Sequence, residues 1–226
     1  RKAASTYGVS EYLETFAGDL LKDEIMNAKK LLSSQKRPMT TIISGAKIST
    51  KLTLIKKLIS KSDNIILGGG ILNTFLKAMG HEIGNSLIEE SFIDEAKEIL
   101  NSDDSNKILM PIDVMVSSSS NLGNPETREI SMVQSNDKIL DIGKKTIDCY
   151  NEVITESSTI FWNGPLGYVE KSPFDNGTIN ISKAIASSQA YSVVGGGDTI
   201  PIIESLQLQN KFSCLSTGGG SLLKFI

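Results

Sequence analysis

Short apolar runs alternate along the chain with longer segments in which apolar residues recur every three or four positions. The short runs are rich in β-branched residues and predict strands at 41–44, 64–67, 107–110, 159–162, 191–194 and 212–215. The helical spacing predicts helices over 20–32, 52–59, 71–79, 90–100, 146–154 and 179–187. Strands that alternate with helices are typical of a parallel sheet covered on both faces. We therefore expect a three-layer α/β domain with a central, mostly parallel sheet.

The segment 113–139 departs from this alternation. Serines at 117–120, followed by Gly123 and Pro125, predict a loop. We expect a short polar strand or two within it, around 129–133. The chain shows no long-period repeat and no linker, so the pattern favours one domain over its 226 residues.

Composition narrows the function classes. Hydrophobic content of 39% and charged content of 22% are ordinary for a soluble globular protein. The apolar runs are far shorter than the roughly 20 residues of a membrane span, and no signal peptide is evident. Cys149 and Cys214 lie far apart without metal-site spacing, which favours two reduced thiols in a cytoplasmic protein. A net charge of −3 without a long basic run argues against a nucleic-acid binder, but a phosphate site remains open.

Glycines cluster directly after the predicted strands. Three triplets, 68–70, 195–197 and 218–220, follow apolar runs, and a fourth turn, 163–167, follows the run that ends in Trp162. The carboxyl ends of parallel strands share one edge of a sheet, where ligands bind. A tight turn that needs positive φ would account for any single triplet. Four such turns together favour a phosphate-binding edge, although neither the P-loop nor the dinucleotide fingerprint is present.

Charged residues stand beside these turns. Asp198 follows the second triplet at a predicted helix start, where a Mg²⁺ ion could join a carboxylate to phosphate oxygens. The alternative is a helix N-cap formed with Thr199. Lys47 and Lys51 are four residues apart after the first strand, so we expect both on one helix face near the sheet edge. The alternative is a solvated basic face.

Together these segments resemble phosphoglycerate kinases. The segments 44–51, 68–70, 161–167, 195–199 and 216–220 stand in the order seen in that family, with shorter matches at 82–86, 109–113 and 140–143. The resemblance runs from Arg1 almost to Ile226. It implies that residues 1–226 form the family's Rossmann-like carboxy-terminal nucleotide-binding domain. Residues 1–15 would form the hinge region and the end of an amino-terminal domain that is otherwise missing.

The resemblance also implies an activity. The family is a phosphotransferase with a carboxyl group as acceptor. It transfers a phosphoryl group reversibly between 1,3-bisphosphoglycerate and MgADP, giving 3-phosphoglycerate and MgATP in glycolysis. We therefore expect Mg²⁺ as cofactor, ATP or ADP as a substrate of this domain, and 3-phosphoglycerate bound through the missing domain. A monomer is expected, without nucleic-acid or membrane partners, and the chain alone should bind nucleotide without turning over.

Residue roles follow from the same resemblance. Catalytic roles near the transferring phosphate fall to Lys47, Gly197 and Gly220. Nucleotide contacts fall to Lys51, Gly69, Leu140, Asn163, Pro165, Glu170, Gly196, Gly197, Asp198 and Thr199. Asp198 would also bind Mg²⁺, and Arg1 would touch the phosphoglycerate substrate.

The sequence departs from the family pattern at Ala3, where histidine is usual, at Lys144, where proline is frequent, and at Ser221, where alanine is usual. Two other functions stay open. A non-catalytic nucleotide-binding module would keep the glycine turns without a substrate domain. An NAD-dependent dehydrogenase would share the fold class, but its fingerprint is absent.

Overall fold

A computed structural model describes residues 3–5, 7–33, 36–118 and 122–226. Within these residues, one sheet has six strands in the order β3-β2-β1-β7-β8-β9. The strands are β3 (Ile108–Leu109), β2 (Asn64–Gly68), β1 (Met39–Ser44), β7 (Thr159–Asn163), β8 (Tyr191–Gly195) and β9 (Cys214–Ser216). Every neighbouring pair in this sheet is parallel. The predicted α/β class and all six predicted strands are confirmed, with their ends displaced by at most a few residues.

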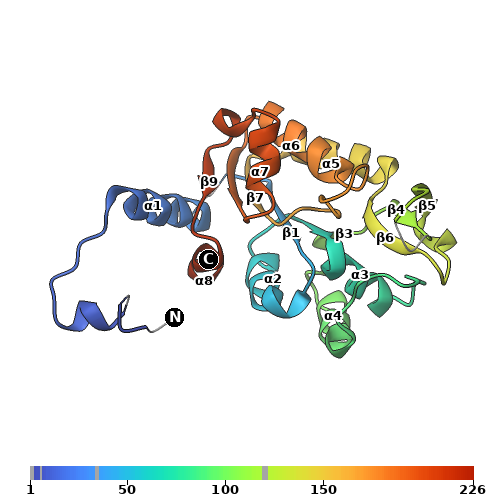
Figure 1. Ribbon diagram of the computed structural model, residues 1–226, viewed down its shortest axis with the longest axis horizontal. Coiled ribbons are helices and arrows are strands. Elements are labelled where there is room, and N and C mark those ends of the chain that lie inside the picture. The colour runs from blue at the N-terminus through green and yellow to red at the C-terminus, as the bar shows by residue number, and fades with distance from the viewer. Residues whose placement is uncertain (1–2, 6, 34–35, 119–121) are drawn as a thin grey trace.

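Helices cover both faces of this sheet (Figure 1). The α-helices are α1 (Asp19–Ser33), α2 (Leu52–Ile59), α3 (Gly69–Ala78), α4 (Ile93–Leu100), α5 (Lys144–Glu156), α6 (Asn176–Ser187), α7 (Ile200–Ser205) and α8 (Gly220–Phe225). Short 3-10 turns are η1 (Gly8–Glu11), η2 (Ile48–Thr50), η3 (Glu90–Phe92), η4 (Ser105–Lys107), η5 (Ile130–Met132) and η6 (Gln209–Lys211). In the view of Figure 1, α2 and α4 lie on one side of the sheet and α5, α6 and α7 on the other. The three predicted layers are therefore present.

The central strands are buried on both faces, which is the reason for their continuous apolar runs. All six residues of β1 are buried, and so are all five of β7, including Phe161 and Trp162. Helix α2 is amphipathic: Leu54, Ile55 and Leu58 face the core, while its lysines face solvent. Burial of these side chains supplies the main favourable free energy that holds the layers together.

A second, antiparallel sheet lies at one end of the molecule, where a loop was predicted. It has the order β5-β4-β6 and is built from β4 (Asp113–Ser117), β5 (Glu126–Glu129) and β6 (Lys138–Ile142). The predicted loop at 113–139 is therefore wrong for these strands, and the predicted polar strand at 129–133 instead ends at Glu129 and continues as η5. The missed strand β4 buries polar ends, because Asp113 accepts hydrogen bonds from the first turn of α5. Residues 119–120 of the predicted serine loop lie outside the described residues.

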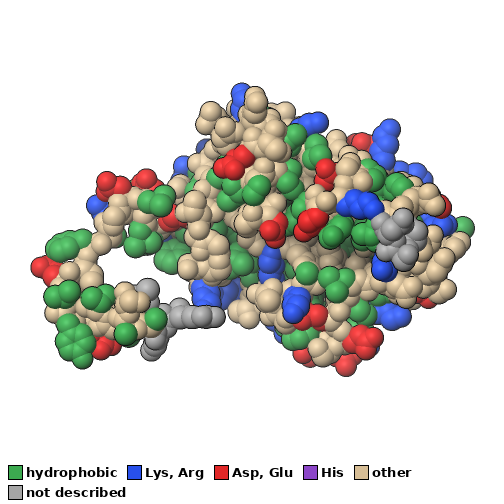
Figure 2. All heavy atoms as spheres, in the orientation of Figure 1, with side chains coloured by type: hydrophobic (Ala, Val, Ile, Leu, Met, Phe, Trp, Pro, Cys, Tyr) green, Lys and Arg blue, Asp and Glu red, His purple; other side chains and the backbone are tan. Residues whose placement is uncertain are grey.

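Helix α1 packs against the main body through a narrow face. Ala28 and Leu31 are buried, whereas Leu20, Leu21 and Met26 are exposed. Residues 7–18 continue from α1 as an arm that extends away from the body (Figure 1). Hydrophobic side chains are prominent on this arm in the space-filling view of Figure 2. None of the helices that the structure describes is both long and apolar enough to cross a membrane.

Candidate nucleotide site

The glycine-rich turns meet at one edge of the large sheet. They follow β2, β7, β8 and β9, and the turn of 45–51 follows β1, so all five leave the carboxyl ends of parallel strands. Hydrogen bonds connect neighbouring turns: the Gly69 N–H donates to Leu166 O at 3.0 Å, and the Ile71 N–H donates to Gly45 O at 3.2 Å. The predicted convergence is therefore confirmed.

Two kinds of glycine occupy this edge. Gly164 has φ +97°, and a Cβ there would lie 2.1 Å from Ser44 O, so only glycine fits. A Cβ at Gly70 would lie 2.3 Å from Ala46 O. At Gly197 and Gly220, by contrast, a Cβ would meet nothing within 4 Å. Tight packing requires the first pair, whereas the backbone of the second pair lies open to a ligand.

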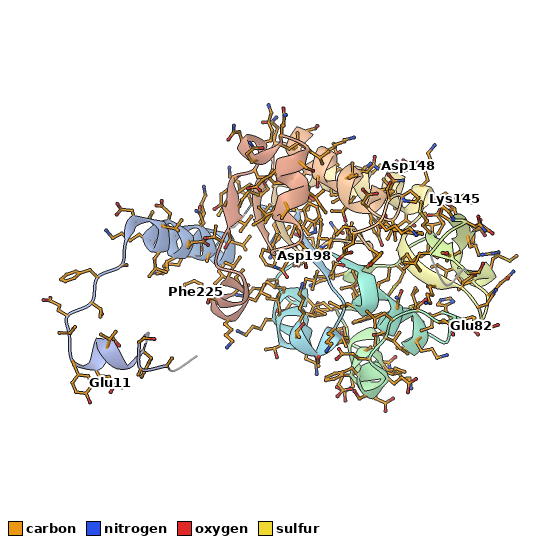
Figure 3. The ribbon with its side chains drawn as sticks, viewed as in Figure 1. Glu11, Glu82, Lys145, Asp148, Asp198 and Phe225 are labelled. Atoms are coloured by element: carbon orange, nitrogen blue, oxygen red, sulfur yellow. The ribbon has the colours of Figure 1, made fainter. Side chains whose placement is uncertain are left out.

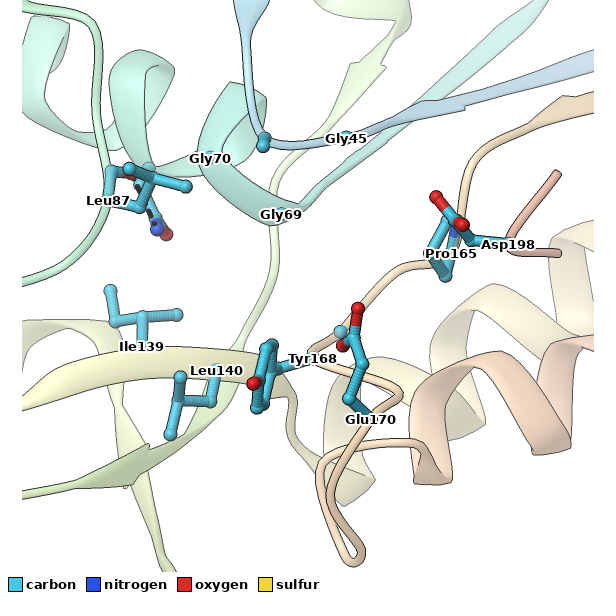
Figure 4. A pocket seen from close by; sticks show the side chains of 13 residues that line it. Gly45, Gly69, Gly70, Leu87, Ile139, Leu140, Pro165, Tyr168, Glu170 and Asp198 are labelled. Carbon is cyan, nitrogen blue, oxygen red and sulfur yellow. Dashed lines mark hydrogen bonds between the residues drawn. The ribbon is translucent and has the colours of Figure 1, made fainter. Parts of the chain in front are cut away.

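A cavity of about 260 Å³ opens beside these turns (Figure 4). Its lining residues are Gly45, Ala46, Gly69, Gly70, Asn73, Leu87, Ile139, Leu140, Pro165, Gly167, Tyr168, Glu170 and Asp198. Figure 4 shows Leu87, Ile139, Leu140 and Tyr168 around one end, and the carboxylates of Glu170 and Asp198 toward the other. An apolar end suits a flat aromatic ring, and an acidic end suits sugar hydroxyls and a metal ion.

Both sheets contribute to this cavity. Ile139 and Leu140 come from β6 of the small sheet, and Tyr168 and Glu170 come from the loop 164–175 that follows β7. The Tyr168 N–H donates to Leu140 O at 2.7 Å and so holds the loop against β6. Segments far apart in the sequence therefore form one wall.

Lys51 lies half-buried at the sheet edge. Its ammonium donates to the carbonyl oxygens of Ser44 and Asn163, the latter at 3.2 Å. Burial lowers the pKa of Lys51 to about 8, and the negative charge of Asp198 limits that shift. A desolvated cation with carbonyl partners is suited to binding an anionic ligand.

The prediction that Lys47 and Lys51 share one helix face is wrong. Lys47 has an extended backbone, residues 48–50 form the 3-10 turn η2, and α2 begins only at Leu52. A 3-10 helix has three residues per turn, so four-residue spacing does not align two side chains on it. Lys47 is exposed, whereas Lys51 turns inward.

Asp198 is exposed and precedes Thr199, the N-cap residue of α7. Thr199 makes no side-chain capping bond, and its buried Oγ1 has no hydrogen-bond partner in the described part of the chain. The N-cap position therefore falls at Thr199, which the alternative named, but without a side-chain cap, and Asp198 is not the N-cap residue of α7. No cluster of three potential metal ligands occurs among the described residues. Mg²⁺ is commonly held by one or two carboxylates together with phosphate oxygens and water, so the exposed carboxylate of Asp198 beside the glycine turns fits this ion.

The remaining predicted residues differ in position. Gly69, Leu140, Pro165, Glu170 and Asp198 line the cavity. Asn163 is buried and reaches Lys51 through its carbonyl oxygen, while Gly196, Gly197, Thr199 and Gly220 lie in the adjoining turns at the same sheet edge. Arg1 lies outside the described residues.

Sequence reasoning missed several lining residues. The clearest are Asn73 on α3, Leu87 in the segment after it, and Tyr168 in the loop after β7. Asn73 and Leu87 carried no signal, because an apolar or amide side chain in a helix or loop is common. Tyr168 stood beside the turn 163–167 and could have been found by extending that turn.

Comparison with known proteins identifies the family. The chain matches phosphoglycerate kinase over residues 1–226. It is 44% identical to the phosphoglycerate kinase of Buchnera aphidicola subsp. Schizaphis graminum over 230 residues, and 43% identical to that of Dictyoglomus turgidum over 230 residues. In both cases the match covers 100% of this chain and 58% of the relative.

Comparison with solved structures leads to the same family. Phosphoglycerate kinase from Coxiella burnetii superposes with a TM-score of 0.91 at 38% identity, over 98% of this chain and 58% of that one. The enzyme from Pyrococcus horikoshii OT3 gives a TM-score of 0.87 at 28% identity, over 100% of this chain and 57% of that one. The chain thus spans somewhat more than half the length of these relatives. Because it is matched along its whole length, the chain belongs to the phosphoglycerate kinase family.

Proposed function

We propose that this chain is the carboxy-terminal nucleotide-binding domain of a phosphoglycerate kinase. In this proposal it binds MgADP or MgATP for reversible phosphoryl exchange with 1,3-bisphosphoglycerate and 3-phosphoglycerate. The observation that carries the proposal is the cavity itself, which has an apolar end and an acidic end and lies beside the glycine-rich sheet edge where Lys51 is half-buried. Phosphoryl transfer requires positioning and charge neutralisation more than covalent chemistry, and these turns provide both.

Different residues would bind different parts of the nucleotide. Leu140 and Tyr168 would cover the base, Glu170 would accept hydrogen bonds from ribose hydroxyls, and Lys51 would neutralise phosphate charge. Asp198 would hold Mg²⁺, which supplies charge neutralisation when bound. The exposed Lys47 and the open backbone N–H groups of Gly197 and Gly220 would face the transferring group, near a phosphoglycerate site outside these residues.

A non-catalytic nucleotide-binding module remains the second candidate, since the cavity alone would serve it equally well. We expect this chain by itself to bind MgADP with no measurable turnover, because the relatives are longer and domain closure completes such sites. Turnover by the chain alone would contradict that part of the proposal. Kinase activity of the parent protein with 3-phosphoglycerate would exclude the non-catalytic module.

The test is calorimetric titration of the chain with MgADP, with ADP without metal, and with NADH. Saturable binding that weakens without Mg²⁺ supports the proposal, whereas NADH binding would favour a dehydrogenase. Asp198→Ala should weaken MgADP binding about tenfold or more, because it removes a charged ligand of the metal. The fold should persist, since Asp198 is exposed.

Asp148→Ala is the matched control. Asp148 is also an exposed aspartate, but it lies on α5, away from Asp198 in Figure 3. It changes net charge equally and should leave MgADP affinity unchanged. Equal loss of affinity in both variants, or equal affinity with and without Mg²⁺ in the unmutated chain, would refute the metal role of Asp198.

A further inference from the structure

A single buried carboxyl group joins three segments behind the cavity wall. Asp141 lies on β6 and is only 2% exposed. Its Oδ2 accepts a hydrogen bond from the Gly177 N–H at 2.6 Å, and its Oδ1 accepts one from the Ile142 N–H at 2.9 Å. Gly177 belongs to the first turn of α6, so the carboxylate of one element caps another.

The backbone closes tightly around this carboxyl group. A Cβ at Gly167 would lie 2.4 Å from Asp141 Cγ, and a Cβ at Gly177 would lie 2.3 Å from Asp141 Oδ1. Neither glycine has a positive φ, so close approach is the reason for their presence. The loop 164–175 and the start of α6 are therefore packed directly onto Asp141.

The same loop forms the cavity wall. Leu140, next to Asp141, accepts the Tyr168 N–H at 2.7 Å, and both Leu140 and Tyr168 line the cavity. The start of the loop is tied by the Leu166 N–H, which donates to Thr178 Oγ1 at 2.9 Å. Asp141 therefore directly follows Leu140, a residue of the cavity wall, and its carboxyl group contacts the loop that contributes Tyr168 to the same wall.

We propose that Asp141 is a positioning residue for the nucleotide cavity. Its carboxylate fixes the loop 164–175 between β6 and α6, and thereby sets how tightly Leu140, Tyr168 and Glu170 enclose a base and its ribose. The identity of the ligand rests on the function proposed above. The positioning of the wall itself does not.

The charge of Asp141 provides a readout that a purely structural role would not move. Burial raises its pKa to about 7, the two N–H donors act against that rise, and the charge of Asp175 adds to it. In the described structure, Asp175 is the charged side chain that acts on this carboxyl group, and the other facing groups are backbone N–H donors. The raised pKa means that the closed wall favours the protonated carboxyl group, whereas opening to water would restore the ordinary pKa. The wall should therefore be more stable near pH 4 than at pH 7 or above.

The first experiment compares hydrogen exchange in the unmutated chain, Asp141→Asn and Asp113→Asn. Asp113 is a matched control: it is equally buried, lies on the adjacent strand β4 and caps α5 through the N–H groups of Lys145 and Thr146. Asp141→Asn should lower the protection of the Tyr168 and Gly177 amides about tenfold or more. Asp113→Asn should leave these two amides protected. Unchanged protection in Asp141→Asn would overturn the proposal, and so would an equal loss in both variants.

Two further measurements sharpen the result. Protection factors of Tyr168 and Gly177 should fall between pH 4 and 7 in the unmutated chain and stay level in Asp141→Asn; parallel profiles would overturn the proposal. Affinity for MgADP, measured at equal folded fraction, should fall about tenfold in Asp141→Asn and not in Asp113→Asn. If the unmutated chain binds no MgADP, the proposed function fails, while hydrogen exchange still decides whether Asp141 positions the wall.

Discussion

The large parallel sheet and the small antiparallel sheet meet at one cavity but contribute to it differently. The large sheet supplies backbone: Gly45, Gly69 and Gly70 approach the cavity without side chains. The small sheet supplies the side chains of Ile139 and Leu140. Close backbone turns such as those at Gly69 and Gly70 have no room for a new methyl group, whereas a wall of side chains can lose volume and keep its fold. Substitutions in the two halves should therefore separate stability from affinity.

The largest effect on stability is expected at the glycine turns of the large sheet. Gly164→Ala would place a methyl group 2.1 Å from Ser44 O in a left-handed conformation. We expect the free energy of unfolding to fall by about 4 kcal/mol or more, measured by urea denaturation. Gly197→Ala is the control on the same edge; with open space around its Cβ, its effect should stay within about 1 kcal/mol. Similar losses in both variants would contradict the distinction between packed and open glycines.

The two halves of the site also differ in how their buried charged groups make the free energy of unfolding depend on pH. The pKa of Lys51 is lowered from 10.5 to about 8, so its protonated form is disfavoured in the folded chain. That penalty is present below pH 8 and is released as pH rises toward 10.5, which adds roughly 3 kcal/mol to the free energy of unfolding across that window. Lys51→Met should lack this rise when unfolding is followed from pH 8 to 10.5. Parallel curves for the two proteins would show that Lys51 is not desolvated.

Asp141, on the small sheet, contributes a pH dependence of the opposite sign. The pKa of Asp141 is raised from 3.8 to about 7, so stability from this group falls as pH rises between those values. Between pH 7 and 8 both Asp141 and Lys51 are charged, and both are largely withdrawn from water. The site is therefore least stabilised by these two groups near neutral pH, as expected when a binding site retains charges for function.

The smallest effect is expected at the side chains that the small sheet contributes to the cavity. Leu140→Ala removes apolar contact from the cavity while β6 keeps its backbone pairing. Affinity for MgADP should fall about fivefold, with a loss of about 1 kcal/mol in unfolding free energy. Met132→Ala, which also truncates an apolar side chain but one that is 62% exposed outside the cavity, is the control and should change neither quantity. An unchanged affinity in Leu140→Ala would mean that the small sheet does not form the base end.

The elements that could be predicted share one property: their local sequence agrees with their burial. Strand β7 is buried on both faces and reads as a continuous apolar run, and α2 has apolar residues at helical spacing over Leu52–Ile59, the range predicted. The small sheet could not be predicted in this way. Its strand β4 buries Asp113 and Ser117 beside Val114 and Val116, and β5 is mostly exposed, so neither shows a clear period.

The residues of the candidate site likewise fall into those that the sequence could predict and those that it could not. The glycine triplets and Asp198 were visible because glycines repeated at the carboxyl ends of parallel strands are typical of ligand-binding turns. The inward turn of Lys51 was not visible, because its direction depends on the 3-10 turn at 48–50 and on the carbonyls of Ser44 and Asn163. Asn73 and Leu87 reach the cavity from segments without any local mark.

By itself, the sequence determined the α/β class, the edge of the sheet where the candidate site lies, and the family to which the motifs point. These properties depend on periodicity and on backbone conformations that few residues besides glycine can adopt. Only the tertiary structure decided that the small sheet closes the cavity, that Lys51 rather than Lys47 turns inward, and that Asp141 lies behind the wall. Each of these depends on contacts between residues far apart in the chain, such as Asp141 with Gly177 and Lys51 with Asn163, and no local pattern encodes such contacts.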